Sequence, residues 1–146
     1  MPMFSARSTS RLASCHPDLR TLFNEVIQHY DCSILCGERS KADQDEARRT
    51  GRSRVSWPNS MHNIDRKKRV TSWAVDVAPY PIDWQDSRGF ALFAGAVLEI
   101  ARRLHREGRM SYAVRWGGDW DGDRSTRDHD FFDGPHFELV GVPHGQ

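Results

Sequence analysis

The stretch Ser72-Trp-Ala-Val-Asp-Val-Ala78 alternates bulky apolar residues with small residues and one carboxylate. Successive side chains of a β-strand point to opposite faces, so this stretch predicts a strand with a buried bulky face and with Asp76 on the other face. A second alternating stretch, His136-Phe-Glu-Leu139, places His136 on the face opposite its apolar residues. If the two strands are neighbours in one sheet, Asp76 and His136 point into the same cleft.

Helical and strand-like periodicities alternate along the rest of the chain, with long loops predicted over residues 50–71 and 117–130. The other predicted elements are an amphipathic helix from Pro17, a strand over 32–36, a polar helix from a capping box at Ser40 to about Arg49, a helix over 90–104 ended by Gly108, and a strand over 112–116. This order predicts an α+β fold, in which helices pack on one face of a small, mostly antiparallel sheet.

Composition limits the classes of protein that the chain can belong to. The 146 residues predict a single domain. A formal net charge of +1 gives no reason to expect nucleic acid as a partner. The mean hydropathy is −0.70, and no apolar run approaches the ~20 residues of a spanning helix, so membrane insertion is not expected. Cys15, Cys32 and Cys36 fit buried thiols better than a disulfide framework or a cysteine zinc site.

Three side chains on polar faces or in loops could share one metal ion. His62, in the long loop, joins Asp76 and His136 to make two imidazoles and one carboxylate, a common zinc set that leaves a fourth position open for catalysis. Asp133, three residues before His136, would suit a general base. Taken singly, each residue also has a simpler interpretation: a solvated loop histidine, a carboxylate that bonds a turn, or a hydrogen-bonded core histidine.

The motifs around these residues resemble one family. Ser60-x-His62, Ala74-Val-Asp76 and Asp133-x-x-His136 followed by Phe-Glu-Leu are together similar to the zinc DD-peptidase superfamily. That superfamily contains D-alanyl-D-alanine carboxypeptidases, vancomycin-resistance dipeptidases and phage L-alanyl-D-glutamate peptidases. The segments 76–84 and 116–120 look most like the last group, the compact endolysins of tailed phages. The resemblance covers residues 35–140 and implies the DD-peptidase (hedgehog-like) zinc peptidase fold.

The resemblance also implies roles for individual residues. His62, Asp76 and His136 match the zinc ligands, with one zinc per chain, and Asp133 matches the catalytic base. Arg39 matches the arginine that stabilises the oxyanion, which a guanidinium held after a strand could do. Ser60 would hydrogen-bond substrate or shape the loop. A longer, cationic insertion over residues 63–74 departs from the pattern and makes His62 the least secure of the three ligands. Its basic run, 66–69, is expected to be solvated or to hold anionic cell wall.

The loop over residues 117–130 carries a second, different pattern. Asp119, Asp121 and Asp123 alternate like the oxygen ligands of a calcium loop, and Asp130 falls at the twelfth position. Arg124 stands where such loops have glycine, and the last ligand is not Glu. Some related phage endolysins use calcium at a comparable place. The alternatives are a calcium site and an ordinary solvated acidic turn.

The expected function is that of a zinc endopeptidase, a bacteriolytic phage endolysin that cuts the L-alanyl-D-glutamate bond of peptidoglycan stem peptides. The alternatives are a D-alanyl-D-alanine carboxypeptidase or dipeptidase of the same fold, and a non-catalytic wall-binding module. A single catalytic domain over residues 1–146, without a separate wall-binding domain, is expected, as is a monomer. Because the N-terminus lacks a signal-peptide pattern, the enzyme is expected to wait in the host cytoplasm until a holin lets it reach the wall from the periplasm.

Overall fold

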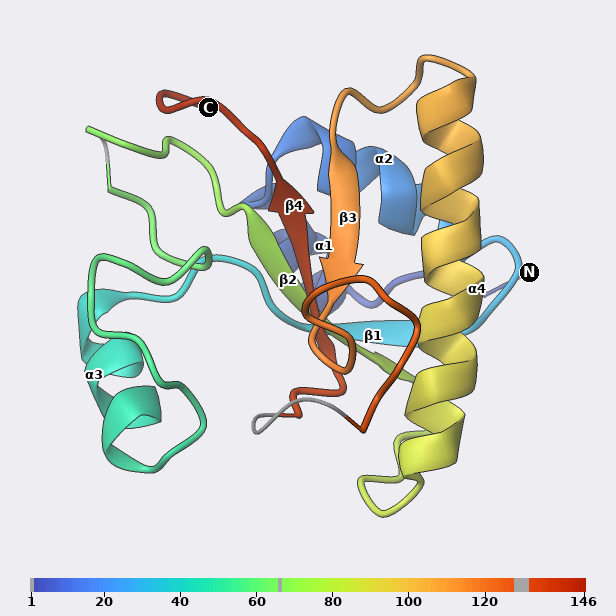
Figure 1. The fold of residues 1–146 in the computed structure, drawn as a ribbon, viewed down its shortest axis with the longest axis horizontal. Helices are drawn as coiled ribbons and strands as arrows, with labels where there is room; N and C mark the ends of the chain where they lie inside the picture. The colour runs from blue at the N-terminus through green and yellow to red at the C-terminus, as the bar shows by residue number, and fades with distance from the viewer. Residues whose placement is uncertain (1, 66, 128–131) are drawn as a thin grey trace.

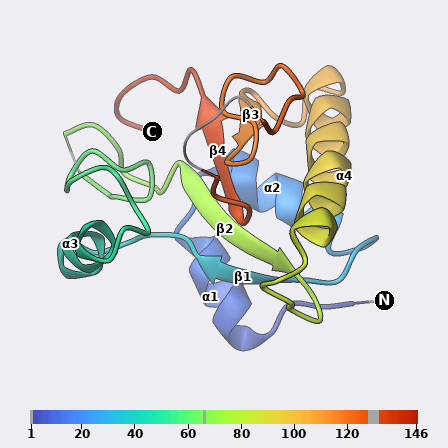
Figure 2. The same ribbon diagram turned by 60° about the horizontal axis from the view of Figure 1, so that its bottom comes forward.

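The computed structural model describes residues 2–65, 67–127 and 132–146, and Figures 1 and 2 show its fold. Its helices and strands follow the predicted order, with one addition at the N-terminus. The elements are α1 (Ala6–Ala13), α2 (Pro17–Val26), β1 (Cys32–Cys36), α3 (Lys41–Arg49), β2 (Ala74–Pro79), α4 (Ser87–Arg106), β3 (Ala113–Trp116) and β4 (His136–Val140).

The strands form one sheet in the order β1-β2-β4-β3, and every neighbouring pair is antiparallel. Strands β2 and β4 are therefore adjacent although a helix and a strand separate them in sequence. Their register pairs Asp76 with His136 directly, and the register of β3 with β4 pairs Arg115 with Glu138. The α+β class is confirmed, and so is the meeting of the two polar residues on one face of the sheet.

The opposite face of the sheet builds the core. Val75, Val77 and Phe137 are fully buried there, on the side of the sheet that α2 and α4 cover, while α1 lies along β1 (Figure 2). The ring of Phe137 meets Phe23 of α2 edge-on at 5.6 Å between centroids, and Phe93 of α4 at 6.3 Å. Burial of one such ring contributes about 1.5–3 kcal/mol, so this layer holds β4 and its polar residues firmly in place.

Helix α1 was not predicted, because residues 6–13 contain too few apolar side chains for a helical pattern. Ser5 caps the helix by accepting a hydrogen bond from the backbone N–H of Ser8 at 3.1 Å. The Ser8 hydroxyl then accepts from the backbone N–H of Ile34, and Arg11 donates to the carbonyl of Ile34 at 3.1 Å. Helix α1 thus satisfies polar groups on the outer edge of β1, which a hydrophobic pattern cannot reveal.

Helix α3 begins at its predicted capping box, where the Ser40 hydroxyl accepts a hydrogen bond from the backbone N–H of Asp43 at 3.1 Å. Among the described residues, 50–71 contain no helix or strand, as expected. In Figure 1 this loop and α3 lie together beyond one end of the sheet. Trp73 is buried, as expected, but apart from the main hydrophobic cluster: the Arg69 guanidinium lies 5.1 Å from its ring centroid, and His144 is stacked on it at 6.5 Å.

None of the described helices is both long enough and apolar enough to cross a bilayer.

Candidate active site

Three side chains from distant parts of the sequence meet above the polar face of the sheet. Asp76 comes from β2, His136 from β4 and His62 from the long loop before β2. One carboxylate oxygen of Asp76 lies 3.1 Å from Nε2 of His62 and 3.2 Å from Nδ1 of His136. The two ring nitrogens lie 3.3 Å apart. The residues proposed as metal ligands therefore converge on one point.

The loop around His62 fixes which ring nitrogen faces this point. Nδ1 of His62 lies 2.7 Å from the carbonyl oxygen of Gly37, which can only accept a hydrogen bond. That contact places a proton on Nδ1 and leaves Nε2 to face Asp76. The loop itself is held by a bond from the backbone N–H of His62 to the Ser60 hydroxyl and by one from the Arg39 N–H to the His62 carbonyl. Ser60 therefore shapes the loop, one of the two roles expected of it.

The second histidine is oriented by a carboxylate. Nε2 of His136 lies 2.7 Å from an oxygen of Glu138, two residues further along the same face of β4. Arg115, on the neighbouring strand, donates twice to the other oxygen of Glu138, at 3.0 and 2.8 Å. These contacts keep Glu138 ionised, so Nε2 of His136 carries a proton and donates a hydrogen bond to Glu138. Nδ1 of His136 is therefore the nitrogen that faces Asp76.

The three facing atoms fit a zinc ion. Tetrahedral ligands at the usual bond lengths of ~2.0–2.1 Å lie about 3.3 Å from one another. The observed separations of 3.1, 3.2 and 3.3 Å match that spacing. Two histidine nitrogens and one carboxylate oxygen are the donor types that zinc favours in catalytic sites, where a fourth position stays open for water or substrate.

The charges of the site also favour a cation. Burial, the largest influence on His62, disfavours its charged form, yet the Asp76 carboxylate outweighs it and raises the pKa of His62 to about 10. Burial acts in the same way on His136, whose bonds to Asp76 and Glu138 raise its pKa to about 9. Burial alone would raise the pKa of Asp76, but the two histidines hold it well below its usual value. A divalent ion would replace these protons.

Cys36 lies closer to the site than the sequence suggested. Its sulfur falls within 4.8 Å of ligand atoms of His62 and Asp76, and its side chain is partly exposed. Cys15 and Cys32 behave as expected: both are buried, and burial raises the pKa of each thiol to about 12. Only two of the three cysteines are therefore inert core thiols.

Asp133 lies beside the ligands without joining their closest contacts. One of its oxygens is 3.9 Å from Nδ1 of His136. Burial, followed by the repulsion of Asp76, raises the pKa of Asp133 to about 6, which suits a group that must take up and release a proton near neutrality. Its backbone is held against Gly117, where any Cβ would collide with the Asp133 carbonyl oxygen. That close approach explains why a glycine stands at position 117.

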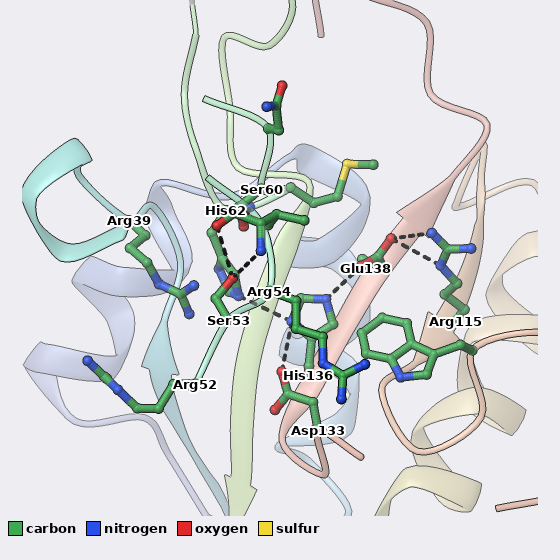
Figure 3. Close-up of a pocket in the computed structure, with 14 residues that line it drawn as sticks. Arg39, Arg52, Ser53, Arg54, Ser60, His62, Arg115, Asp133, His136 and Glu138 are labelled. Atoms are coloured by element: carbon green, nitrogen blue, oxygen red, sulfur yellow. Dashed lines mark hydrogen bonds and ion pairs between the residues drawn. The ribbon is translucent and has the colours of Figure 1, made fainter. Parts of the chain in front are cut away.

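Arg39 faces the same site from the segment before α3. Its guanidinium donates to the second oxygen of Asp76 at 3.3 Å and to the buried amide oxygen of Gln44 at 3.2 Å. Figure 3 shows Arg39 at one side of a pocket that also exposes His62, Asp133 and His136. The arginine therefore orients a ligand carboxylate and keeps a positive charge beside the place where substrate would react.

The acidic loop places its first three carboxylates together, as the calcium hypothesis requires. Asp119, Asp121 and Asp123 each offer an oxygen within 4.8 Å of the others. Arg124, which stands at the glycine position of such loops, has φ 69°, the left-handed conformation that glycine normally supplies. Its backbone N–H donates to Asp119 at 2.7 Å. Asp130, the proposed last ligand, lies outside the described residues.

Comparison with known proteins places the chain in a family. Residues 2–140 match the family described as phage L-alanyl-D-glutamate peptidase. The chain belongs to this family. A solved relative is the L-Ala D-Glu endopeptidase ChiX of Serratia marcescens, with 32% identity, a TM-score of 0.65, and coverage of 94% of this chain and 90% of that one. A search of curated proteins found no match. The predicted family, fold and peptidase activity are confirmed.

Sequence reasoning missed several residues that support the site of this peptidase. Arg69 was grouped with a solvated basic run, which is wrong for this residue: it is buried, and its guanidinium donates to the carbonyls of Asn63 and Pro58 at 3.0 and 2.6 Å. It thus ties together the loop that carries His62. The one signal in the sequence that could have indicated its burial was its position just before the strand of Asp76. Arg66, in the same basic run, lies outside the described residues.

Glu138 is a second supporting residue: on the same face of β4 as His136, it pairs with His136 and with Arg115. The change Glu138→Gln removes the carboxylate that orients the imidazole, so zinc affinity should fall by about 10–100-fold. Competition with a chelator measures this affinity. Glu107→Gln, which changes an exposed carboxylate of the same type just after α4, is the matched control. Equal zinc affinity in the Glu138 and Glu107 variants would remove Glu138 from the metal site.

Proposed function

We propose that this peptidase cuts the L-alanyl-D-glutamate bond of peptidoglycan stem peptides with one zinc ion held by His62, Asp76 and His136. The observation that carries the proposal is the convergence of three metal-binding atoms, at 3.1–3.3 Å from one another, in a member of this family. A partly buried carboxylate, Asp133, and a guanidinium, Arg39, stand beside them. A module that only bound the wall would need neither.

The side chains around the metal would divide the chemistry between them. When bound, zinc supplies a Lewis acid that activates water and polarises the carbonyl of the scissile amide. Asp133 takes the proton that the attacking water loses, and later returns it to the amine nitrogen of D-glutamate as the amide bond breaks. Arg39 presents positive charge toward the oxygen that becomes negative. Gly37 and Glu138 keep the two imidazoles in the tautomers that leave their facing nitrogens free of protons.

Mass spectrometry of digested peptidoglycan tests the proposal, because each rival produces different ends. The proposed enzyme releases stem peptides that begin with a free D-glutamate amine and leaves L-alanine on the glycan. A carboxypeptidase would release free D-alanine instead, and a binding module would release nothing. Zinc analysis of the active protein tests the metal, and an active enzyme without stoichiometric zinc or a substitute metal would contradict the site.

We further propose that the loop at Asp119, Asp121 and Asp123 binds calcium. Two features support this: the clustered carboxylates, and the left-handed backbone of Arg124 at the glycine position. Like charges so close repel one another without a cation. The loop leads directly to Asp133 and His136, so a bound calcium would steady the catalytic base and one zinc ligand.

Activity on isolated peptidoglycan, measured with zinc held fixed, should therefore rise across a calcium titration. The variant Asp121→Asn should shift the midpoint to higher calcium, because it removes one negative ligand. Asp45→Asn, an exposed carboxylate on α3, provides the control. A flat response together with no calcium binding by calorimetry would leave the loop as a solvated acidic turn.

The route to the substrate is a further proposal that rests on the phage family. The peptidase would collect in the host cytoplasm and reach the wall from the periplasm after a holin opens the inner membrane. Cells that express it should stay intact until a permeabiliser is added, whereas prompt lysis on expression alone would contradict this route. The expected monomer stays a prediction, which sedimentation of the purified protein can check.

A further inference from the structure

The space around the catalytic residues consists of two hollows that meet at Arg39, Arg52 and Asp133. One hollow, of about 270 Å³, is lined by His62 and His136. The other, of about 720 Å³, opens on the side of Asp76. Substrate that crosses the metal site would therefore extend into both hollows, which differ in chemistry.

The hollow beside the two histidines is cationic. Arg52 and Arg54 reach it from the loop that follows α3, and Arg115 closes it on the side of the sheet (Figure 3). Among its described lining residues the acidic ones are Asp133 and Glu138, and Glu138 is already paired with Arg115 and His136. Guanidinium groups therefore outnumber carboxylates among the described residues that line this hollow.

The hollow beside Asp76 is distinguished by its aromatic residues instead. Trp84 and Phe132 line it and are 60% and 48% exposed, unusually high fractions for such large rings. The indole of Trp84 is stacked on Phe90 at 5.6 Å, which holds it in place while more than half of it remains accessible. Asp43, Asp76 and Asp133 line this hollow together with Arg39 and Arg52, so it lacks the excess of guanidinium groups found beside the histidines. The surface would accept a neutral, ring-shaped group.

The substrate of the proposed function has the same asymmetry. The L-alanine of a stem peptide is attached through a lactyl group to a muramic acid sugar, so a neutral glycan lies on its side of the scissile bond. The D-glutamate continues through its γ-carboxyl group, so its α-carboxylate lies free, beside the scissile nitrogen. The two sides of the bond thus carry a sugar and an anion.

We propose that the glycan lies on Trp84 and Phe132, and that the D-glutamate α-carboxylate lies in the hollow of Arg52 and Arg54. This inference rests on the proposed function and adds the direction in which the substrate crosses the site. Rings on the aromatic surface would contact the C–H faces of the sugar, and a guanidinium would form charge-assisted bonds to the carboxylate. The contact with the sugar would favour wall-attached peptides over peptides already released from glycan, whereas the contact with the carboxylate would be the same for both.

Three soluble substrates separate the two halves of the cleft. The first is N-acetylmuramyl-L-Ala-γ-D-Glu-diaminopimelate. The second carries an N-acetyl group in place of the muramyl sugar, so that the alanine nitrogen stays acylated. The third keeps the sugar but has D-isoglutamine, which replaces the α-carboxylate by a neutral amide. Values of kcat/KM are compared for zinc-loaded wild-type enzyme and for each variant.

The variant Trp84→Ala should lower kcat/KM about ten-fold on both sugar-bearing substrates and leave the N-acetyl substrate unchanged. Trp84→Phe should keep most of the activity. The double variant Arg52→Gln with Arg54→Gln should lower kcat/KM about 10–100-fold on both substrates with the α-carboxylate, and hardly at all on the isoglutamine substrate. Tyr30→Ala, an exposed aromatic after α2, and Arg106→Gln, on α4, serve as matched controls. Thermal melts confirm that each variant is folded.

In the opposite pattern, the arginine variant would lose kcat/KM only on the sugar-bearing substrates, and the Trp84 variant only on the substrates with the α-carboxylate. That result would reverse the direction of the substrate and overturn the inference. Equal losses on all three substrates would overturn it as well. Wild-type enzyme that cleaves none of the three would count against the proposed function itself, which keeps the two failures apart.

Discussion

Asp133→Asn should retain one zinc per chain and lose turnover by roughly 10²–10⁴-fold, the usual contribution of a general base. The substitution preserves the size of the side chain but removes its ability to accept a proton. Because Asp133 lies 3.9 Å from Nδ1 of His136, outside the closest contacts among the ligands, metal binding should survive the change. Zinc analysis and kcat on the same preparation measure both outcomes.

The pH dependence of wild-type activity should also show that Asp133 acts as a base. Asp133 works as a base only when ionised, and burial raises its pKa to about 6, so activity should fall as the pH drops through that region. Asp133→Glu, which keeps a carboxylate on a longer side chain, should recover part of the lost turnover. Near-full activity of Asp133→Asn at neutral pH, or loss of its zinc, would show that the assigned role is wrong.

His136→Ala should lose both zinc and activity. The substitution removes the Nδ1 atom that faces Asp76 and leaves Glu138 without its imidazole partner, so two of the contacts that organise the site disappear together. With two ligands left, zinc should no longer remain bound through dialysis, and no activator of water would be present. Metal analysis after dialysis and digestion of peptidoglycan measure the two losses.

His105→Ala is the control for this variant, because His105 lies on α4, outside the described linings of the two catalytic hollows. It should keep zinc and activity. Circular dichroism separates loss of metal from loss of fold, and the core contacts of Phe137 should keep β4 in place. Stoichiometric zinc in folded His136→Ala would exclude this histidine as a ligand.

The amino-acid sequence by itself determined every helix and strand after α1, and the faces on which the key residues lie. Alternation of side chains around Asp76 and around His136 is a local property of a strand, and helical spacing after Pro17 is equally local. The capping box at Ser40 needs only four consecutive residues. The family resemblance then united residues that no local pattern could connect, and the match over residues 2–140 bears it out.

Tertiary structure alone decided how these pieces meet. The direct pairing of Asp76 with His136 depends on strand order, and their 60-residue separation in sequence leaves that order open. The path that brings His62 to the site depends on buried contacts such as those of Arg69, whose charge suggested a solvated position. The choice of facing nitrogen depends on partners in space, the Gly37 carbonyl and Glu138. The division of the cleft into a cationic and an aromatic half has the same origin, since its walls come from loops that adjoin only in the folded chain.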